Sequence, residues 1–249
     1  MKKVLLIITT LLFTAFSAFA QSNEATLSQI GDDNTATIDQ VGDLNYTSLT
    51  QEDGATADID QIDASSSFVS LSQIGSSSAT IFQTNKNSVQ GFTDQWNTPA
   101  ASKLATQEGS GNTMDITQLS EFNQAYVDQF GDNNSMSILQ DGGISNIARI
   151  LQDGTGNSID VDLIGSINRV NAQQYGVGNS ATVSVTGDKN NEFGGTGSSY
   201  IYQDGMDHTA TVTLMGDENF YDISQMGSAQ TATVTATGNG NSAVITQSN

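Results

Sequence analysis

Hydrophobic and polar side chains alternate along most of this chain. From Asn241 to Gln247 every second residue reads Asn, Ala, Ile and Gln, and Ser, Val and Thr lie between them. Every second side chain of an extended strand points to the same face. The pattern therefore predicts short β-strands with one buried face, and the Thr, Ser and Asp residues at most intervening positions suit a solvated face.

The same segment recurs about every 11 residues, and a glutamine marks its end. Two residues before the glutamine lies an apolar residue, such as Ile38, and four residues before it lies a small one, often Ala. The marker glutamines that we expect to stack are Gln29, Gln40, Gln51, Gln61, Gln73, Gln83, Gln107, Gln118, Gln129, Gln140, Gln152, Gln174, Gln203, Gln225 and Gln247. Gln95 falls at the same spacing and counts as a further unit.

An asparagine and a glycine frame each strand. The asparagines, six residues before the marker, are Asn34, Asn45, Asn112, Asn123, Asn134, Asn146, Asn157, Asn168, Asn179, Asn219 and Asn241. The glycines that we assign to turns, two residues after the marker, include Gly31, Gly42, Gly131, Gly165, Gly176, Gly216, Gly227 and Gly238. Glycine adopts positive φ without strain, and Asn bonds the nearby backbone. Each unit is therefore expected to be one strand and one tight turn.

Two units are expected to form one rung. With Gln29 as the first unit, the markers that are not glutamine all fall on odd-numbered units: Leu163, Val185, Leu214 and Ala236. This alternation follows if odd units stack on odd units and even units on even units. We therefore predict an all-β fold, a parallel two-strand-per-turn β-solenoid of about ten 22-residue rungs, with strands about 4.8 Å apart.

The stacked amides are expected to satisfy one another and to leave both ends of the stack open. A Gln or Asn stacked on its own kind donates to one neighbour and accepts from the other. The last unit, from Asn241 to Gln247, matches the repeat well and shows no charged or helical cap. Globular proteins block strand edges, and monomeric solenoids need polar caps. The pattern therefore predicts end-to-end growth.

Two regions interrupt the repeat. Between residues 84 and 106 the spacing is blurred, and Trp96, Pro99 and Lys103 break the pattern. Between residues 190 and 199 about seven residues are added, including Gly194 and Gly195. Both regions are expected to be loops that bulge from the corners of rungs.

The first twenty residues predict a secretory signal peptide. Lys2 and Lys3 precede an apolar run from Val4 to Phe16, and Ala18-Phe19-Ala20 resembles a cleavage site. The run is too short to span a bilayer, which takes about 20 apolar residues. Residues 21–249 then form the solenoid of a secreted, extracellular protein, and we expect no transmembrane segment in them.

The composition excludes some kinds of site and disfavours one class of partner. The chain has no cysteine, so disulfides and thiolate metal sites are excluded. Its formal charge of -20 becomes -22 without Lys2 and Lys3, which disfavours nucleic acid as a partner. Outward carboxylates such as Asp39 and Asp60 either slow assembly during export or simply confer solubility.

The repeat Q-x-G-x-x-N-x-A-x-(I/V)-x-Q, clear from Gln29 to Gln40 and from Gln174 to Val185, resembles the curlin repeat of curli fibre subunits. The likeness covers nearly all of residues 21–249. It implies a functional amyloid that assembles with copies of itself into cell-surface fibres for adhesion and biofilm matrix. It also implies a nucleator subunit, an outer-membrane export pore and a periplasmic chaperone as partners, and no cofactor.

The chain departs from the family pattern in three ways. It loses one glutamine column in its C-terminal half, and it has roughly twice the repeats of the familiar five-repeat subunits. Only Gln21 to Leu27 precede the first marker, where the family usually has a glycine-rich export segment. A clean last repeat without a basic tail favours a major subunit over the alternative, a surface-bound nucleator.

Other functions fit the residues less well. Threonine pairs such as Thr35 and Thr37 suggest an ice-binding solenoid, but we expect them not to form one continuous column. Gly-Asp steps suggest a calcium-binding solenoid, whose period is nine residues rather than eleven. An enzyme is not expected, because the only histidine, His208, lies in an asparagine position and a filled solenoid offers no cavity.

Overall fold

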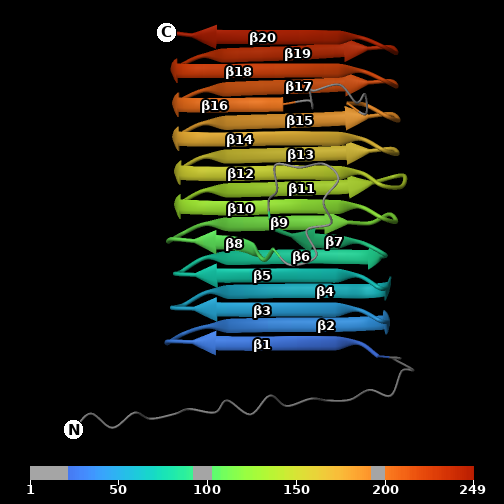
Figure 1. Ribbon diagram of the computed structural model, residues 1–249, viewed down its shortest axis with the longest axis vertical. Coiled ribbons are helices and arrows are strands. Elements are labelled where there is room, and N and C mark those ends of the chain that lie inside the picture. Colours follow the sequence, from blue (N-terminus) through green and yellow to red (C-terminus); the bar gives the residue numbers. More distant parts are fainter. Residues whose placement is uncertain (1–21, 92–102, 192–199) are drawn as a thin grey trace, which may run out of the picture.

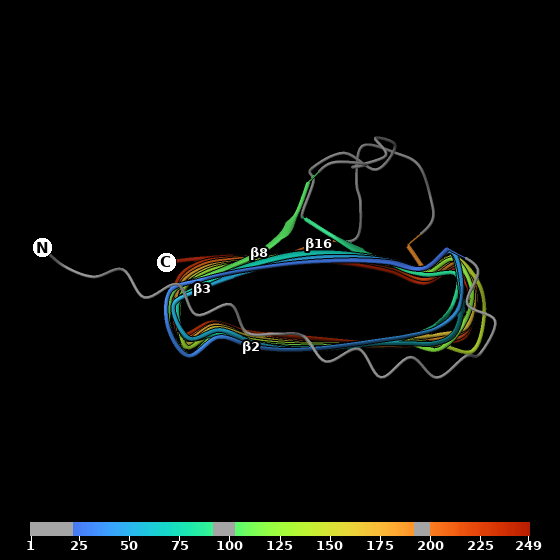
Figure 2. The ribbon, with the colours of Figure 1, turned by 90° about the horizontal axis from the view of Figure 1, so that it is seen from below.

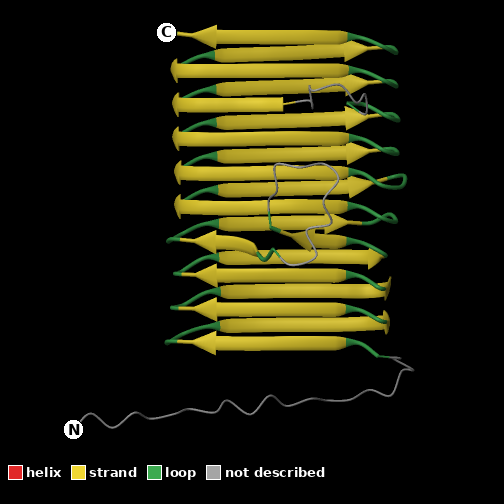
Figure 3. Ribbon diagram, viewed as in Figure 1, coloured by secondary structure: helices red, strands yellow, loops and turns green. Residues whose placement is uncertain are grey.

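A computed structural model describes residues 22–91, 103–191 and 200–249 as two parallel β-sheets without any helix in these ranges. The strands lie in flat layers along one long axis (Figures 1 and 3). Sheet A contains Glu24–Ile30 (β1), Tyr46–Glu52 (β3), Phe68–Ile74 (β5), Ser88–Gln90 (β7), Ala105–Glu108 (β8), Gln124–Asp132 (β10), Ile147–Thr155 (β12), Arg169–Val177 (β14), Tyr200–Met206 (β16), Phe220–Ser228 (β18) and Ser242–Ser248 (β20). Sheet B contains Thr35–Asp43 (β2), Thr56–Ser65 (β4), Ser78–Asn85 (β6), Thr113–Gln118 (β9), Ser135–Asp141 (β11), Ser158–Ile164 (β13), Ser180–Thr186 (β15), Thr209–Met215 (β17) and Thr231–Thr237 (β19).

Successive strands alternate between the two sheets, so the chain winds as a solenoid. Seen along the stack, sheets A and B form the two long sides of a flattened ring, and the turns close its ends (Figure 2). Neighbours within a sheet are parallel and in register: Gln129 pairs with Gln152, and Ile138 pairs with Val161. The predicted β-solenoid is thus confirmed. Nine strands of sheet B mark nine complete turns, close to the ten rungs expected, and β20 adds a last layer to sheet A.

The core lies between the two sheets and is filled by the inward positions of the repeat. Ile59, Val127 and Ile150 are fully buried beside Ala57, Ala125 and their equivalents. The marker glutamines of the inner layers are equally buried. Because period two places the apolar residue, the small residue and the glutamine on one face, the sequence pattern fills the core without any helix to cover it.

The first irregular region interrupts a strand rather than a corner. β7 and β8 share one layer: β7 pairs with the first part of β5 and of β10, and β8 pairs with their later parts. The chain therefore leaves the layer after Gly91 and returns at Lys103, in the middle of sheet A (Figure 1). The expectation of a loop at a rung corner was wrong here, because the insertion separates two strands of one layer, β7 and β8, and both turns of the rung are kept.

This interruption also changes which units stack together. Gln95 lies outside the described residues, and Gln107 takes the place of the marker in that layer, above Gln73 and below Gln129. Gln29, Gln51 and Gln73 therefore share a column with Gln107 and the later even-numbered units. The strict odd-on-odd assignment was wrong across the interruption, because the extra glutamine counted a unit that supplies no layer of its own.

The second irregular region follows the first residue of its layer. Asn191 N donates to Asn219 O over 2.8 Å, so Asn191 stacks at the strand start, and pairing resumes with Tyr200 opposite Asn171. This insertion too begins inside a layer of sheet A rather than at a corner. Residues 192–199 lie outside the described part of the chain.

The predicted signal peptide, residues 1–20, also lies outside the described residues. Among the residues that the structure does describe, no helix is long and apolar enough to cross a membrane.

Candidate assembly site: amide columns and end strands

A column of ten glutamines runs through the core on the side of sheet A. Each Nε2 donates to the Oε1 of the glutamine in the next layer over 2.7–3.0 Å. In order along the axis they are Gln29, Gln51, Gln73, Gln107, Gln129, Gln152, Gln174, Gln203, Gln225 and Gln247. Every donor therefore points toward the C-terminal end of the stack.

The second glutamine column, on the side of sheet B, stops halfway. Gln40, Gln61, Gln83, Gln118 and Gln140 bond in the same direction over 2.7–2.9 Å. Leu163, Val185, Leu214 and Ala236 then continue the column. The replacement of an amide column by an apolar one, expected on one side of the C-terminal half, lies on the inner face of sheet B.

The second hydrogen of most inner amides also finds a partner. Gln51 Nε2 donates to Thr35 O over 2.9 Å, and Gln129 Nε2 donates to Thr113 O over 3.0 Å. Each acceptor is the first residue of the strand that lies half a turn below, in the other sheet. Both donors of a fully buried amide are thus used, which removes the cost of burying an unpaired polar group.

Two asparagine columns line the corners where strands begin. In each, the backbone N–H of one residue donates to the side-chain oxygen of the residue in the layer below, as Asn134 N does to Asn112 Oδ1 over 2.9 Å. Asn134 Nδ2 also donates to Phe130 O and Gly154 O, which closes the turn. The corner before sheet A holds Asn23, Asn45, Ser67, Asn87, Asn123, Asn146, Asn168, Asn190, Asn219 and Asn241. The corner before sheet B includes Asn34, Asn112, Asn134, Asn157, Asn179 and His208.

The spacing rule missed several members of these columns. Asn87 and Asn190 lie next to the two insertions, which separate them from their markers by more than six residues. Asn190 ends a Gly-x-x-Asn turn that starts at Gly187, and this signal could have found it without the count to the next glutamine. Asn87 has Thr84 in place of the glycine, so the sequence offers no such signal for it. His208 does occupy an asparagine position, where its Nδ1 accepts a hydrogen bond from Gln230 N over 3.3 Å.

Most turn glycines lie against the backbone of the next layer. Gly31, Gly42, Gly131, Gly165, Gly176, Gly216, Gly227 and Gly238 all have positive φ. A Cβ on Gly131, at φ +94°, would lie 2.0 Å from the carbonyl oxygen of Gly154 in the next layer. Glycine is needed here for both its backbone conformation and its missing side chain.

The outer layers leave part of the core open at both ends of the stack. Leu27, Ala36 and Ile38 are only partly buried at one end, and Ala236, Ala243 and Ile245 are only partly buried at the other. All six occupy positions that are fully buried in the inner layers. Among the described residues no element covers the outer edges of β1, β2, β19 and β20.

A comparison with known protein families matches the curlin associated repeat to residues 20–52, 109–142 and 216–248. This is a curlin-repeat protein. Each matched segment of the curlin-repeat chain holds three strands, namely β1 to β3, β9 to β11 and β18 to β20. The family suggested by the glutamine and asparagine spacing is thereby confirmed. No curated protein matches the chain.

The outer face of sheet B in this curlin-repeat protein carries carboxylates in adjacent layers. Asp39 pairs in register with Asp60, and Asp58 lies two residues before Asp60 on the same face. Burial, and then the charges of Asp58 and Asp39, raise the pKa of Asp60. Among the described residues no group of three or more His, Asp or Glu side chains could hold a metal ion.

One outward position of sheet B carries a hydroxyl in every layer. It holds Thr35, Thr56, Ser78, Thr113, Ser135, Ser158, Ser180, Thr209 and Thr231. The expectation that the threonines do not form one continuous column was right for threonine alone, because serine interrupts it. It missed that serine and threonine together do form a continuous column.

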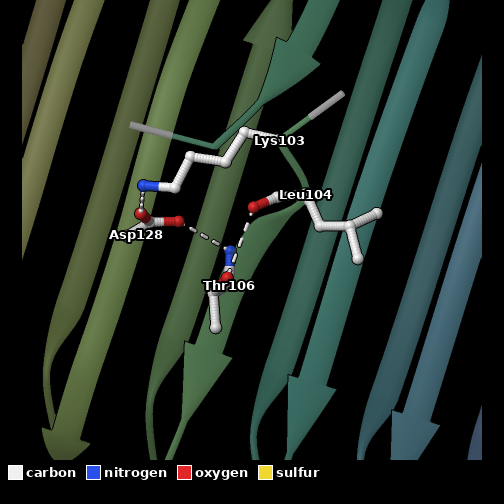
Figure 4. Close-up of polar contacts among 4 residues, drawn as sticks. All are labelled: Lys103, Leu104, Thr106 and Asp128. Atoms are coloured by element: carbon white, nitrogen blue, oxygen red, sulfur yellow. Dashed lines mark hydrogen bonds and ion pairs between the residues drawn. The ribbon is translucent and has the colours of Figure 1, made fainter. Parts of the chain in front are cut away.

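An ion pair between an exposed lysine and a buried carboxylate fixes the return of the first insertion to sheet A. Lys103 Nζ lies 2.7 Å from Asp128 Oδ2, and Thr106 N donates to Asp128 Oδ1 over 2.9 Å (Figure 4). The Asp128 side chain is 2% exposed, whereas that of Lys103 is 51% exposed. Burial raises the pKa of Asp128, and its contacts with Lys103 and Thr106 partly oppose this shift.

Proposed function

We propose that this curlin-repeat protein is a secreted structural subunit that polymerises end to end into amyloid-type fibres on the cell surface, where the fibres serve adhesion and biofilm matrix. The single observation that carries the proposal is the pair of open ends. Both end layers present unpaired strand edges, partly exposed core residues and the residue pattern of the interior.

The physical driving force for growth is the same as the one that holds the inner layers together. A parallel strand that docks on an open edge completes a row of backbone hydrogen bonds, and its amides extend the side-chain columns. Burial of a Leu or Ile side chain adds about 1.5–3 kcal/mol. Ile38 and Ile245 gain this burial only when another copy covers them.

The stacked outer carboxylates oppose growth. Asp39 and Asp60 lie in adjacent layers, and their repulsion weakens the stack when both are ionised. Such charges repel one another and so keep chains with unpaired strand edges apart before export is complete. In the proposed pathway the chain is exported through an outer-membrane pore with a periplasmic chaperone and starts fibres on a nucleator subunit.

The test is to purify residues 21–249, which contain every described strand, in denaturant and to dilute them into buffer. Amyloid-dye binding, electron microscopy and seeding are followed over time. We expect unbranched fibres that seed further growth and diffract near 4.8 Å. Protein that stays monomeric with intact sequence contradicts the proposal. Growth that depends strictly on added foreign fibre ends identifies a major subunit, whereas rapid unseeded growth that also starts fibres of other subunits identifies a nucleator.

The hydroxyl column of sheet B and the threonines two and four residues farther along its strands support a second candidate function, an ice-binding surface. Thr182, Thr211 and Thr233 lie in adjacent layers, and Thr213 pairs with Thr235 beside them. β-branched residues are also common on any solvated strand face, so the column by itself favours fibres as much as ice. A thermal-hysteresis measurement on the soluble chain separates the two, and we expect no hysteresis.

A further inference from the structure

The first and last described strands lie in the same sheet. β1 and β20 both belong to sheet A, and β7 and β8 share one layer, so sheet A has ten layers where sheet B has nine. Each strand lies half a turn above the strand before it. The described stack therefore holds nineteen half-turns, and the next half-turn after β20 belongs on the side of sheet B.

This odd count decides how a second copy fits on the end. If the copy is added without rotation, its β1 lies on β20, but one layer of sheet B stays empty between β19 and the next β2. If the copy is turned by half a revolution about the long axis, its β1 lies on β19 and its β2 lies on β20. Every layer of both sheets is then filled.

We propose that successive subunits in the fibre are related by a half-turn about the fibre axis, so that the sheet A of one subunit continues the sheet B of the next. The inference rests on the proposed end-to-end assembly and specifies its joint. The partner is a second copy of this chain, and the two surfaces in contact are the outer edges of β1 and β2 on one copy and of β19 and β20 on the other.

The side chains of β20 and β2 match in this arrangement. Aligned at their marker glutamines, as strands are within the chain, they place Gln247 under Gln40, Ile245 under Ile38 and Ala243 under Ala36. Gln247 Nε2 donates one hydrogen to Thr231 O over 3.1 Å, and its other hydrogen is available to a residue in the next layer. Gln40 is the lowest glutamine of its column and donates upward to Gln61, so its Oε1 is open to that donor.

The other half of the joint brings β19 against β1. Val234 then lies under Leu27 and Ala236 lies under Gln29. An apolar residue and a glutamine already meet once inside the chain, where Leu163 follows Gln140 in the column. At the joint the order is reversed, because Gln29 donates upward to Gln51 and its Oε1 faces Ala236. This half of the joint therefore contributes strand pairing and apolar contact, and the amide bond across the joint is that of Gln247 with Gln40.

The rotated joint also supplies the second acceptor for Gln29. Inner amides donate to the first residue of the strand half a turn below, as Gln51 does to Thr35 O. In the rotated joint the strand half a turn below Gln29 is β20 of the lower copy, whose first residue is Ser242. Without rotation that layer is the empty one, and the amide loses its acceptor.

Two pairs of cysteine variants distinguish the arrangements, and the chain has no cysteine of its own. Val244, Thr37 and Thr26 each lie three residues before their markers, and all three are exposed on the outward face. The rotated joint places Val244 beside Thr37 of the next copy, and the unrotated joint places it beside Thr26. Paired residues of adjacent strands lie within the Cα separation of a disulfide, about 4.4–6.8 Å.

Val244→Cys protein is co-assembled in equal amounts with either Thr37→Cys or Thr26→Cys protein, and the fibres are mildly oxidised and run on a denaturing, non-reducing gel. We expect a disulfide-linked dimer with Thr37→Cys, several-fold above that with Thr26→Cys. Fibres whose dimers form with Thr26→Cys, equally with both, or with neither overturn the half-turn joint while leaving end-to-end assembly intact. Absence of fibres from the unmodified chain overturns the proposed function instead.

Gold labelling provides an independent measurement. Asp153 is exposed on the outward face of β12 in sheet A, so Asp153→Cys carries the label without disturbing the joint. Nine and a half layers of about 4.8 Å give a rise of about 46 Å per subunit. We expect labels to alternate between opposite sides of the fibre at this rise, and labels along a single side overturn the inference.

Discussion

Gln129 lies directly beneath Gln152 and donates a hydrogen bond to its Oε1 over 2.8 Å, although 23 residues separate the two in sequence. Gln129 Oε1 in turn accepts from Gln107 Nε2 over 2.7 Å. The amide therefore needs one oxygen that faces down and one nitrogen that faces up. No other side chain of the same shape as glutamine has both an acceptor oxygen and a donor nitrogen at these positions.

Replacement of Gln129 by glutamate tests this polarity. In Gln129→Glu the second carboxylate oxygen faces Gln152 Oε1, and the buried charge has no cation beside it. We expect a loss of about 3–5 kcal/mol, the cost typical of an unpaired buried charge. The concentration of monomer that coexists with fibres should rise more than a hundredfold, because each 1.4 kcal/mol corresponds to a factor of ten.

Gln124→Glu is the matched control for this charge. Gln124 lies five residues earlier in the same strand and is partly exposed on the outer face. The control should change the monomer concentration by less than tenfold. If both variants behave alike, net charge and not the amide column controls assembly.

The glycine columns predict a steric effect at Gly131. In Gly131→Ala the new Cβ would lie 2.0 Å from Gly154 O, so two layers must move apart. Gly156 also has positive φ, at +67°, but its Cβ would meet nothing within 4 Å. Backbone strain should destabilise Gly156→Ala by about 1–2 kcal/mol. Gly131→Ala should lose clearly more in fibre dissolution by denaturant, and equal losses would contradict the close contact.

The outer carboxylates predict a more stable fibre in mild acid. Burial raises the pKa of Asp60, Asp162 and Asp222 above that of the unfolded chain, and like charges add to the shift at Asp60 and Asp162. The folded state then holds protons that the unfolded chain has released, so stability falls as pH rises from about 3.8 through the raised pKa values. We expect the monomer concentration at the end of growth to decrease from pH 7 toward pH 4.

Asp60→Asn removes one of these groups and should flatten this pH dependence. The measurement is the residual monomer concentration of the variant and of the unmodified chain at the same set of pH values. An unchanged slope would show that the acid effect arises elsewhere on the chain.

The open ends predict that growth is most sensitive to charge in the end layers. Gln40→Lys or Gln247→Lys places an ammonium group in the column where the next copy must dock, and a buried, unpaired charge is costly. Elongation measured on preformed seeds should slow at least tenfold. Thr246→Lys, which is exposed on the outer face of the same strand, should slow it far less. Equal rates for Gln247→Lys and the unmodified chain would contradict the role of the column in growth.

The ion pair at the first insertion predicts a local effect on stability. Lys103→Met leaves the buried Asp128 without its cation, so the pKa of Asp128 rises further and folding then favours the protonated carboxyl. We expect a loss of about 1–3 kcal/mol at pH 7 that decreases in acid. Adding Asp128→Asn to Lys103→Met should restore part of the stability, and no recovery in the double variant would contradict this account.

Much of the fold was predictable because each layer repeats the chemistry of the one below. The period of two gave the buried face, the period of about 11 gave the strand length, and the loss of glutamine at Leu163, Val185, Leu214 and Ala236 indicated two columns. Local residues also placed the turns, because Gly-x-x-Asn adopts few backbone conformations.

The sequence by itself determined that these strands stack in register, because a glutamine in the next layer can both donate to and accept from a buried glutamine. The tertiary structure decided which units share a column and how many half-turns the stack contains. Gln95 has the right spacing, yet Gln107 completes the layer begun by β7. Spacing along a chain counts residues, whereas a column depends on which residues come back to the same place after an insertion, and only the backbone pairing of the folded chain specifies that.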